Sequence, residues 1–310
     1  MERRYNVTTE LPPGYTPDFV TFLFNAADHL KLQSDSWLQF FLIGKSNKKI
    51  KAQLSVHVAD GVAISPVKAP FGSFQYSDDL SPEDLYDFIG ECENRLKRTG
   101  VKAVKLVEPP LHYRDSGEML HTLLFNRGFR ASNVELSCGI RIDALNFEEK
   151  IESWEKRKLR QARSRGLRFK LLPISELEVV YDFILRCRSE RGTALSMSLD
   201  ALQQTINFFK DRFFLFVAML EKECVAASIA IQVHPDILYN FYSGHLKKHD
   251  SMSPVVFLMA GMYRFCESHS IHLLDLGTSA INGQPNFSLL EFKMRLGGSP
   301  SIKFTFEKEL

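Results

Sequence analysis

The chain has 310 residues, of which 45% are hydrophobic and 25% are charged, and its formal net charge is +2 at pH 7. This length allows one large domain or two domains of about 150 residues each. The composition is typical of a globular protein. The small net charge argues against a strongly basic nucleic-acid-binding protein, so any basic surface must be local.

The sequence indicates neither a membrane span nor a disulfide framework. The first ten residues lack the apolar segment of a secretory signal. The longest apolar run, 255–263, is far shorter than the ~20 residues of a membrane-spanning helix. The five cysteines are scattered and form no Cys-x-x-Cys pair, which favours reduced thiols. We therefore expect a cytoplasmic protein without a membrane span, and the oligomeric state stays open.

Two histidine pairs have ligand-like spacing but do not predict a metal site. His245 and His249 flank two lysines, whose charge opposes a cation, and His269 and His272 lie at a helix end and near a strand. Neither pair has an obvious third ligand in the sequence. We therefore expect no metal cofactor.

The first half of the chain predicts a hairpin followed by alternating helices and strands. Thr16-Pro17-Asp18 indicates a helix start, and apolar residues at steps of three and four continue this pattern to about Gln33. Ser81-Pro82, followed by two acidic residues, indicates a second helix that ends near Gly100. The other expected elements are strands at 37–43, 50–58, 101–107 and 134–142 and a helix at 117–126.

The second half repeats this order of elements. Ser253-Pro254 begins a helix of nearly the same length as the one at Ser81-Pro82, and a short strand follows each of these helices at once. The repetition predicts two copies of one α/β unit, with domains at 1–148 and 149–310. The other expected elements are strands at 213–220, 225–233, 237–243, 271–276 and 302–306 and a helix around 287–296.

A basic helix is expected to open the second domain. Residues 150–170 include nine Lys or Arg residues and two Glu residues. Such a segment can neutralise the phosphates of tRNA or of a nucleotide-linked molecule. Its apolar positions Leu159, Ala162 and Leu167 also fit an ordinary helix with one face in solvent, and we favour this second interpretation.

Several motifs resemble those of GNAT acyltransferases, and in particular of the Fem-type transferases with two GNAT-like domains. The order of elements and the Gly-Phe turn at 126–129 resemble the GNAT fold. The segment 156–169 resembles the basic helix that opens the second Fem-type domain. Leu273–Gly277 resembles a strand that ends in Asp-x-Gly. Phe292-Lys293 with Gly297-Gly298 resembles a Phe-Lys…Phe-Gly-Gly signature in which Leu296 replaces the aromatic residue.

The resemblance implies an α/β (α+β) fold of two tandem GNAT-like domains, each with a mixed β-sheet flanked by helices. It also implies transfer of an acyl or aminoacyl group from an activated carrier to an amine. We favour acyl-CoA, acetyl-CoA above all, as the donor and a small-molecule or peptide-like amine as the acceptor. The chain is nearly neutral and has no evident RNA-binding appendage, so tRNA is not favoured.

Two alternatives to this function stay open. One is a Fem-type aminoacyl transferase that uses aminoacyl-tRNA on a cell-wall precursor. The other is a catalytically degenerate GNAT-like binding module, because the usual acetyl-CoA loop (Arg/Gln-x-x-Gly-x-Gly/Ala) is absent from both halves.

Three residues are candidates for catalysis by direct attack of the amine on the acyl carbon. Lys293 matches a lysine that contacts the donor and the developing oxyanion in Fem-type enzymes. Asp275 can accept the amine proton or cap the turn at Gly277. Tyr242 can donate a proton to the leaving group or fill the core with its hydroxyl at the rim. No Ser-His-Asp or Cys-His pattern indicates a covalent intermediate.

The loop after the strand 237–243 is the candidate donor site, because a strand that leads through a loop to a helix N-terminus suits an anionic ligand. We expect the sheet to part here; a flexible surface loop is the alternative. The residues expected to meet the carrier phosphates are Gly244, Lys247, Lys248, Ser251 and Ser253.

The equivalent loop of the first half is the candidate acceptor site. It can shape a pocket between the domains, or its proline and glycine residues can form a rigid structural turn. The candidate acceptor residues are Phe71, Gly72, Ser73, Tyr76 and Tyr113.

Overall fold

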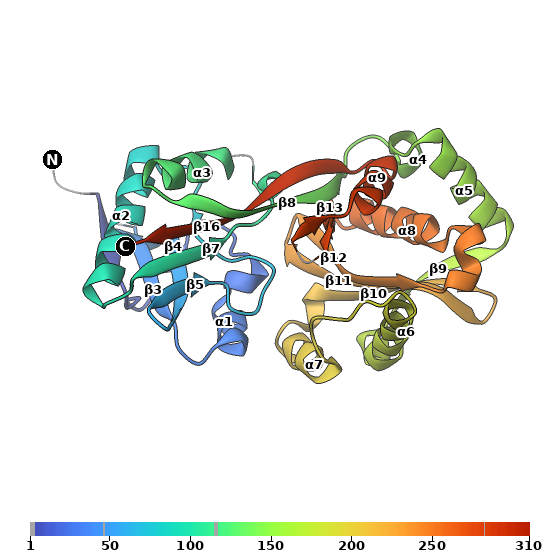
Figure 1. Ribbon diagram of the computed structural model, residues 1–310, viewed down its shortest axis with the longest axis horizontal. Coiled ribbons are helices and arrows are strands. Elements are labelled where there is room, and N and C mark those ends of the chain that lie inside the picture. The colour runs from blue at the N-terminus through green and yellow to red at the C-terminus, as the bar shows by residue number, and fades with distance from the viewer. Residues whose placement is uncertain (1–3, 46, 115–116, 282) are drawn as a thin grey trace. The chain divides into compact units, whose positions relative to one another are not determined.

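The structure is a computed structural model that describes residues 4–45, 47–114, 117–281 and 283–310. The chain forms two compact units, each built of strands and helices (Figure 1). The first unit contains Met1–Glu135 and Ile302–Leu310, and the second unit contains Leu136–Ser301.

The sheet of the first unit has the strand order β1-β3-β4-β5-β7-β16. Its first four strands are antiparallel neighbours, β7 is parallel to β5, and β16 is antiparallel to β7. The bounds are β1 Tyr5–Thr8, β2 Thr16–Pro17, η1 Leu23–Asn25, α1 Ala27–Gln33, β3 Leu38–Gly44, β4 Lys49–Ala59, β5 Val62–Ser65, β6 Gln75–Tyr76, α2 Pro82–Arg98, β7 Ala103–Val107, η2 Leu111–Tyr113, α3 Gly117–Asn126 and β16 Ser299–Glu309.

The sheet of the second unit has the order β9-β10-β11-β12-β13-β8. Its first four strands are again antiparallel neighbours, β13 is parallel to β12, and β8 is antiparallel to β13. The bounds are β8 Arg130–Arg141, α4 Phe147–Lys150, α5 Ser153–Ser164, β9 Leu167–Leu172, η3 Ile174–Glu176, α6 Leu177–Ser189, α7 Leu199–Phe208, η4 Lys210–Arg212, β10 Phe213–Leu220, β11 Glu223–His234, β12 Ile237–His245, η5 Lys247–Met252, α8 Pro254–Ser268, β13 Leu273–Thr278, β14 Ala280–Ile281, β15 Gln284–Pro285 and α9 Phe287–Arg295.

The two sheets therefore share one topology. In each sheet, four antiparallel neighbours lie side by side, the next strand is parallel to the fourth, and an antiparallel closing strand lies beyond it. A helix connects the two parallel strands. The helix between the parallel strands is α2 in the first unit and α8 in the second. The predicted duplication of one mixed α/β unit is confirmed.

The closing strands are exchanged between the two halves of the chain. β8 follows first-unit elements in the sequence, but its residues 137–141 pair with β13. β16 ends the chain and pairs with β7 through residues 305–309. The units are therefore divided within β8 and within β16, and not at residue 148. The predicted domains 1–148 and 149–310 differ from these units, because only pairing between distant segments determines which sheet a closing strand joins. Whether these two ranges fold independently stays a prediction.

The two helices that follow a Ser-Pro pair begin where the sequence predicts. The Ser81 side chain accepts a hydrogen bond from the Asp84 N–H, and Pro82 is the first residue of α2. α8 likewise begins at Pro254. Ser253 differs from the expected N-cap, because it has a φ of 49° and its side chain makes no capping hydrogen bond.

The helix start predicted at Thr16 is wrong. Thr16–Pro17 forms β2, which pairs in parallel with β4, and the helix α1 begins only at Ala27. Pairing with a neighbouring strand therefore overrides the local capping signal.

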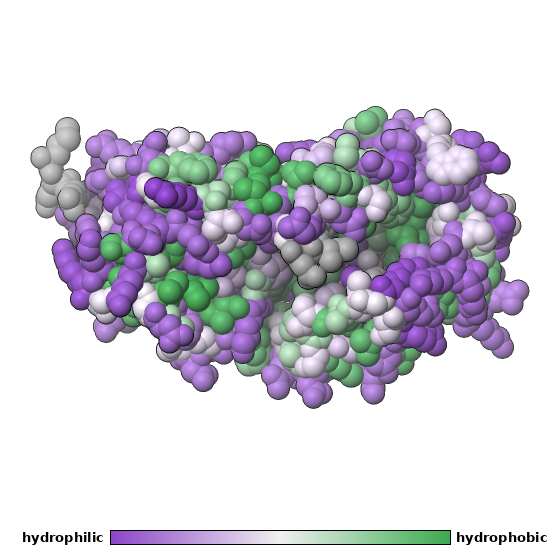
Figure 2. All heavy atoms as spheres, in the orientation of Figure 1, coloured by the Kyte–Doolittle hydropathy of each residue, from purple (hydrophilic) through white to green (hydrophobic). Residues whose placement is uncertain are grey.

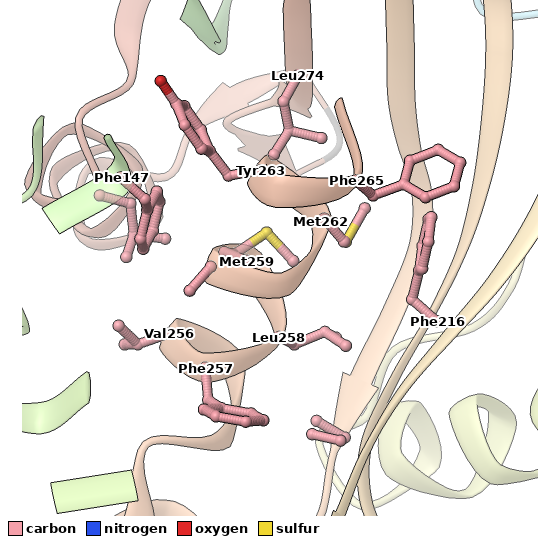
Figure 3. Close-up of a cluster of buried hydrophobic side chains, with 14 of the residues drawn as sticks. Phe147, Phe216, Val256, Phe257, Leu258, Met259, Met262, Tyr263, Phe265 and Leu274 are labelled. Carbon is pink, nitrogen blue, oxygen red and sulfur yellow. The ribbon is translucent and has the colours of Figure 1, made fainter. Parts of the chain in front are cut away.

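The helix α8 lies inside the core of the second unit. Buried apolar residues occur around most of it, which is the pattern of a helix largely enclosed by protein. Only its last turns carry exposed residues, which are Arg264, Glu267 and Ser268. Figure 3 shows Phe147 on one side of α8 and Phe216 on the other, where its ring lies 5.0 Å from that of Phe265. Neither α8 nor any other helix of the described residues is long and apolar enough to cross a membrane.

Glu108, directly after β7, is a buried carboxyl group in the first unit. The Ser73 hydroxyl donates a hydrogen bond to its Oε1, and His121 Nε2 lies 3.8 Å from its Oε2. Burial raises the pKa of Glu108 to about 7, although the Ser73 hydrogen bond and the charge of Arg114 oppose this shift. Burial also lowers the pKa of His121 to about 4. Glu108 therefore titrates near neutral pH in the folded protein.

We predict that Glu108→Gln is more stable than the wild type at pH 8 and that the difference shrinks toward pH 5. The unfolded chain releases this proton near pH 4.5 and the folded chain near pH 7, so the contribution of Glu108 to stability is present below pH 4.5 and lost as pH rises through 7. The full shift corresponds to about 3 kcal/mol. Urea unfolding across this pH range measures the difference.

The control for this prediction is His121→Gln. The pKa of His121 is lowered, so its contribution to stability has the opposite sign and is lost as pH falls. A wild type and a Glu108→Gln variant with the same pH dependence of stability would contradict the assignment to Glu108.

Candidate active site

The candidate active site lies where β12 and β13 part. These parallel strands pair over only three positions, the last of which joins Tyr239 and Asp275. Beyond this point β12 continues to His245 and β13 to Thr278 without pairing with each other. The sheet therefore parts where it was expected to, and its freed backbone groups need other partners.

A cavity of about 530 Å³ lies between the parted strands. This volume is within the range of small-molecule sites, about 300–1,000 Å³. The helices α8 and α9 contribute mainly apolar side chains to its lining, whereas Arg188 at the end of α6 and Arg191 just after it contribute two guanidinium groups. The residues that define its chemistry are Arg188, Arg191, Tyr239, Phe241, Leu258, Leu289, Phe292 and Lys293.

Lys293 on α9 brings a buried cation to this cavity. It is 7% exposed, and its Nζ donates hydrogen bonds of 2.8 Å to the carbonyl oxygens of Gly277 and Thr278. Burial lowers the pKa of Lys293 to about 8; the charge of Asp275 opposes this shift and that of Arg188 adds to it. Lys293 therefore stays mainly protonated at neutral pH.

Among the residues that the structure describes, only two of the three N–H donors of Lys293 have a partner. An ammonium group has three N–H donors, and two of them bond to backbone carbonyls. No further hydrogen bond joins this ammonium to a described residue. A buried cation with one available donor at a cavity is suited to hold a negatively charged oxygen.

Asp275 stabilises the turn after the paired part of β13. Its Oδ1 accepts hydrogen bonds from the Gly277 N–H at 2.8 Å and from Ser137 Oγ at 3.1 Å. Gly277 has a φ of 75°, and a Cβ there would lie 3.3 Å from the ring of Tyr239. Asp275 does not line the cavity. The contacts support the capping alternative, and the role of Asp275 as proton acceptor stays a prediction.

Tyr242 does not line the cavity, which corrects its expected position. Its hydroxyl accepts a hydrogen bond from the Met197 N–H at 2.9 Å and lies 2.6 Å from Ser196 Oγ. Tyr242 is buried and joins β12 to the segment before α7. These contacts support the alternative in which this tyrosine fills the core.

Tyr239 is the tyrosine that lines the cavity. The consecutive residues Tyr239, Asn240 and Phe241 all line it, so the strand does not alternate strictly here. The register of β12 against β11 skips Phe241, and a bulge of this kind changes the direction of neighbouring side chains. Tyr242 was preferred because it lies nearest the loop, whereas the alternation of the strand groups Tyr239 with Phe241 and Ser243, which all line the cavity.

Two arginines, Arg188 in the last turn of α6 and Arg191 just after this helix, were not predicted from the sequence. Arg188 Nε donates to the Ser243 carbonyl at 3.2 Å, and an Arg191 guanidinium nitrogen donates to the His245 carbonyl at 2.8 Å. Both arginines line the cavity. No motif marked them, because only the fold brings α6 next to β12.

The predicted donor loop is only partly at the cavity. Gly244 lines the cavity, and a Cβ there would lie 2.8 Å from the Cβ of Cys187 on α6, so glycine allows this close packing. The other predicted donor residues are absent from the lining: Lys247, Lys248, Ser251 and Ser253.

The two lysines of this loop bind other protein groups. Lys247 Nζ donates to the Glu190 carbonyl at 2.5 Å. Lys248 forms an ion pair of 2.5 Å with Glu223, and both of these side chains are well exposed. The surface-loop alternative fits these contacts, and a role of the loop in donor binding stays a prediction.

The predicted acceptor residues lie in the interior of the first unit. The Phe71 ring centroid lies 5.3 Å from that of Phe22, 5.0 Å from that of Phe24 and 5.4 Å from that of Tyr113. These contacts support the rigid-turn alternative, and acceptor binding stays a prediction. The five residues, all buried, are Phe71, Gly72, Ser73, Tyr76 and Tyr113.

The sequence matches no family model and no curated protein, but solved structures match nearly its whole length. FemX has a TM-score of 0.71 and 13% identity, with 94% of both chains covered. L-PGS from Bacillus licheniformis has a TM-score of 0.56 and 14% identity, with 91% of this chain and 86% of that chain covered. A tandem GNAT protein from the clavulanic acid biosynthesis pathway has a TM-score of 0.50 and 12% identity, with 88% and 83% covered.

These similarities confirm the predicted fold class, a Fem-like tandem GNAT fold with mixed sheets flanked by helices. At these identities the likeness concerns the fold. The function must therefore be argued from the cavity and the buried cation at its wall.

We predict that Asp275→Ala lowers the free energy of unfolding by roughly 1–3 kcal/mol, because the buried Gly277 N–H loses its charged acceptor. Asp275→Asn keeps an acceptor oxygen and should lose less. Urea unfolding measures both variants. An Asp275→Ala variant as stable as the wild type would contradict the capping role. Loss of transfer activity in a stable Asp275→Asn variant would instead support the proton-acceptor role.

Proposed function

We propose that this protein is a cytoplasmic N-acyltransferase that moves an acyl group from acyl-CoA, with acetyl-CoA as the first donor to test, to the amine of a small or peptide-like acceptor. The observation that carries this proposal is the buried Lys293 ammonium at the cavity between β12 and β13. The tandem GNAT fold supports the class of reaction. Five free cysteines support a reducing compartment.

In the proposed reaction the acceptor amine attacks the acyl carbon directly. The new C–N bond forms and the acyl oxygen becomes negatively charged. The carbonyl then re-forms as the C–S bond breaks, the nitrogen releases one proton, and the departing CoA thiolate takes up one proton to leave as a thiol. The available N–H donor of Lys293 stabilises the oxyanion, because a preorganised cation away from bulk water interacts strongly with developing charge. Arg188 adds positive potential at the same cavity.

A second candidate donor is aminoacyl-tRNA. The similarity to FemX and to L-PGS favours this candidate at the level of fold. The chain is nearly neutral, which favours the smaller CoA carrier. A binding module without transfer activity is the third candidate, supported by the absence of the usual acetyl-CoA loop from the sequence.

We predict that acetyl-CoA raises the unfolding temperature and that aminoacylated tRNA does not. A ligand that binds only the folded state stabilises it by mass action. Differential scanning fluorimetry with acetyl-CoA, free CoA, aminoacylated tRNA and deacylated tRNA separates the candidates. A shift with aminoacylated tRNA alone would support the second candidate, and no shift with any of them would contradict both transferase proposals.

We predict that Lys293→Ala lowers kcat by about 10²–10³-fold, the usual effect of removing one oxyanion donor. The wild-type rate should fall as pH rises through about 8, because the required ammonium form of Lys293 is lost there. Lys293→Arg keeps the charge and should shift this alkaline limb to higher pH.

The unfolding temperatures of both variants serve as the control for Lys293, because the carbonyls of Gly277 and Thr278 lose a donor in Lys293→Ala. Full activity of a folded Lys293→Ala variant would contradict the assignment. A wild-type rate that still increases above pH 8 would contradict the requirement for the ammonium form of Lys293.

A further inference from the structure

A second cavity of the second unit lies against α4, α5 and α8 and has a volume of about 460 Å³. It shares no lining residue with the cavity at Lys293. Phe147 and Ala260, which are both buried, contribute apolar surface to it. Figure 2 shows hydrophilic residues over the region where Figure 1 places α5. The basic helix predicted from the sequence therefore forms part of a cavity as well as a solvated face.

Three cations at this cavity have no partner among the described residues. Lys156 and Arg160 come from α5, and Arg264 comes from α8. None of the three side chains forms an ion pair or a hydrogen bond with a described residue. Lys156 and Arg160 are four residues apart on one helix, where like charges destabilise each other. An anion bound between them would remove this repulsion.

The acidic residues of the cavity do not cancel these charges. Glu148 forms an ion pair with Arg163, so these two residues neutralise each other. Glu149 accepts a hydrogen bond of 2.8 Å from the Asn146 N–H as part of the cap of α4. Glu267 is the remaining acid, and it is exposed. The three unpaired cations therefore exceed the two acids that carry no ion pair.

We propose that this cavity binds the phosphate group of a small organic phosphate. Arg and Lys side chains form strong charge-assisted hydrogen bonds with phosphate oxygens. A volume within the range of small-molecule sites leaves room for an organic group beside the phosphate, and Phe147 and Ala260 supply apolar contact for it. This site is independent of the proposed transfer reaction, because Lys293 takes no part in it.

Arg157 can distinguish binding in this cavity from binding to a general basic surface. It lies on the same helix and is exposed, but it does not line the cavity. Its guanidinium carbon lies 5.7 Å from the centroid of the Trp154 ring. An extended polyanion such as RNA would contact the exposed basic face of α5, including Arg157. A small phosphate bound in the cavity would not contact Arg157.

Isothermal titration calorimetry at constant ionic strength tests the proposal with inorganic phosphate, pyrophosphate and ADP, and with a short single-stranded RNA in a separate arm. The wild type is expected to bind at least one of the three small compounds. Arg160→Gln and Arg264→Gln should each weaken this binding by about tenfold or more, the loss expected for a charge-assisted hydrogen bond. The matched control Arg157→Gln should leave it unchanged.

Two results would overturn the proposal. The first is a wild type that binds none of the three small phosphates at millimolar concentration. The second is an Arg157→Gln variant that loses as much affinity as Arg160→Gln, which would indicate a diffuse basic surface; tighter binding of RNA that depends on Arg157 would indicate the same. Thermal unfolding confirms that each variant is folded, and the binding readout does not depend on transfer activity.

Discussion

The hydrogen bonds of the Lys293 ammonium with the Gly277 and Thr278 carbonyls are the interaction on which the candidate site depends. β12 and β13 stop pairing after Tyr239 and Asp275, and buried carbonyls without a strand partner would be strongly destabilising. A cation from α9 satisfies two of these carbonyls. The same bonds that allow the sheet to part also hold the ammonium at the cavity, so stability and the proposed catalysis rely on one side chain.

The open sheet is supported by rigid packing on both sides. α8 is packed on most of its surface by apolar residues, among them Phe147 and Phe216 (Figure 3). α6 approaches β12 closely because residue 244 is glycine. Native cores are packed densely and do not deform continuously. The cavity therefore has fixed walls, which favours preorganised electrostatics over a site that must assemble around its ligand.

The sequence predicted those features that follow from local signals or from a motif. Pro254 correctly predicted the start of α8, and the Phe-Lys motif drew attention to Lys293, which lines the cavity. Tyr242 was placed wrongly because nearness to the loop was the criterion, although strand alternation already separates it from Tyr239, which lines the cavity. The exchange of β8 and β16 could not be predicted from the sequence, because it depends on pairing between strands that are far apart in the chain. Arg188 reaches the cavity only through tertiary packing.

The first unit shows why one copy of the duplicated fold has the open sheet. Its strand β5 pairs with β7 along its whole length. The carbonyl of Val107, at the end of β7, accepts a hydrogen bond of 2.9 Å from the Gly72 N–H. The loop that follows β5 thus supplies a hydrogen-bond donor from its backbone, where the second unit uses the Lys293 side chain. Phe71, next to Gly72, is buried among aromatic rings. Gly72, one of the residues expected to bind the acceptor, therefore helps to close the sheet of the first unit, whereas the buried ammonium of Lys293 lies at the open sheet of the second.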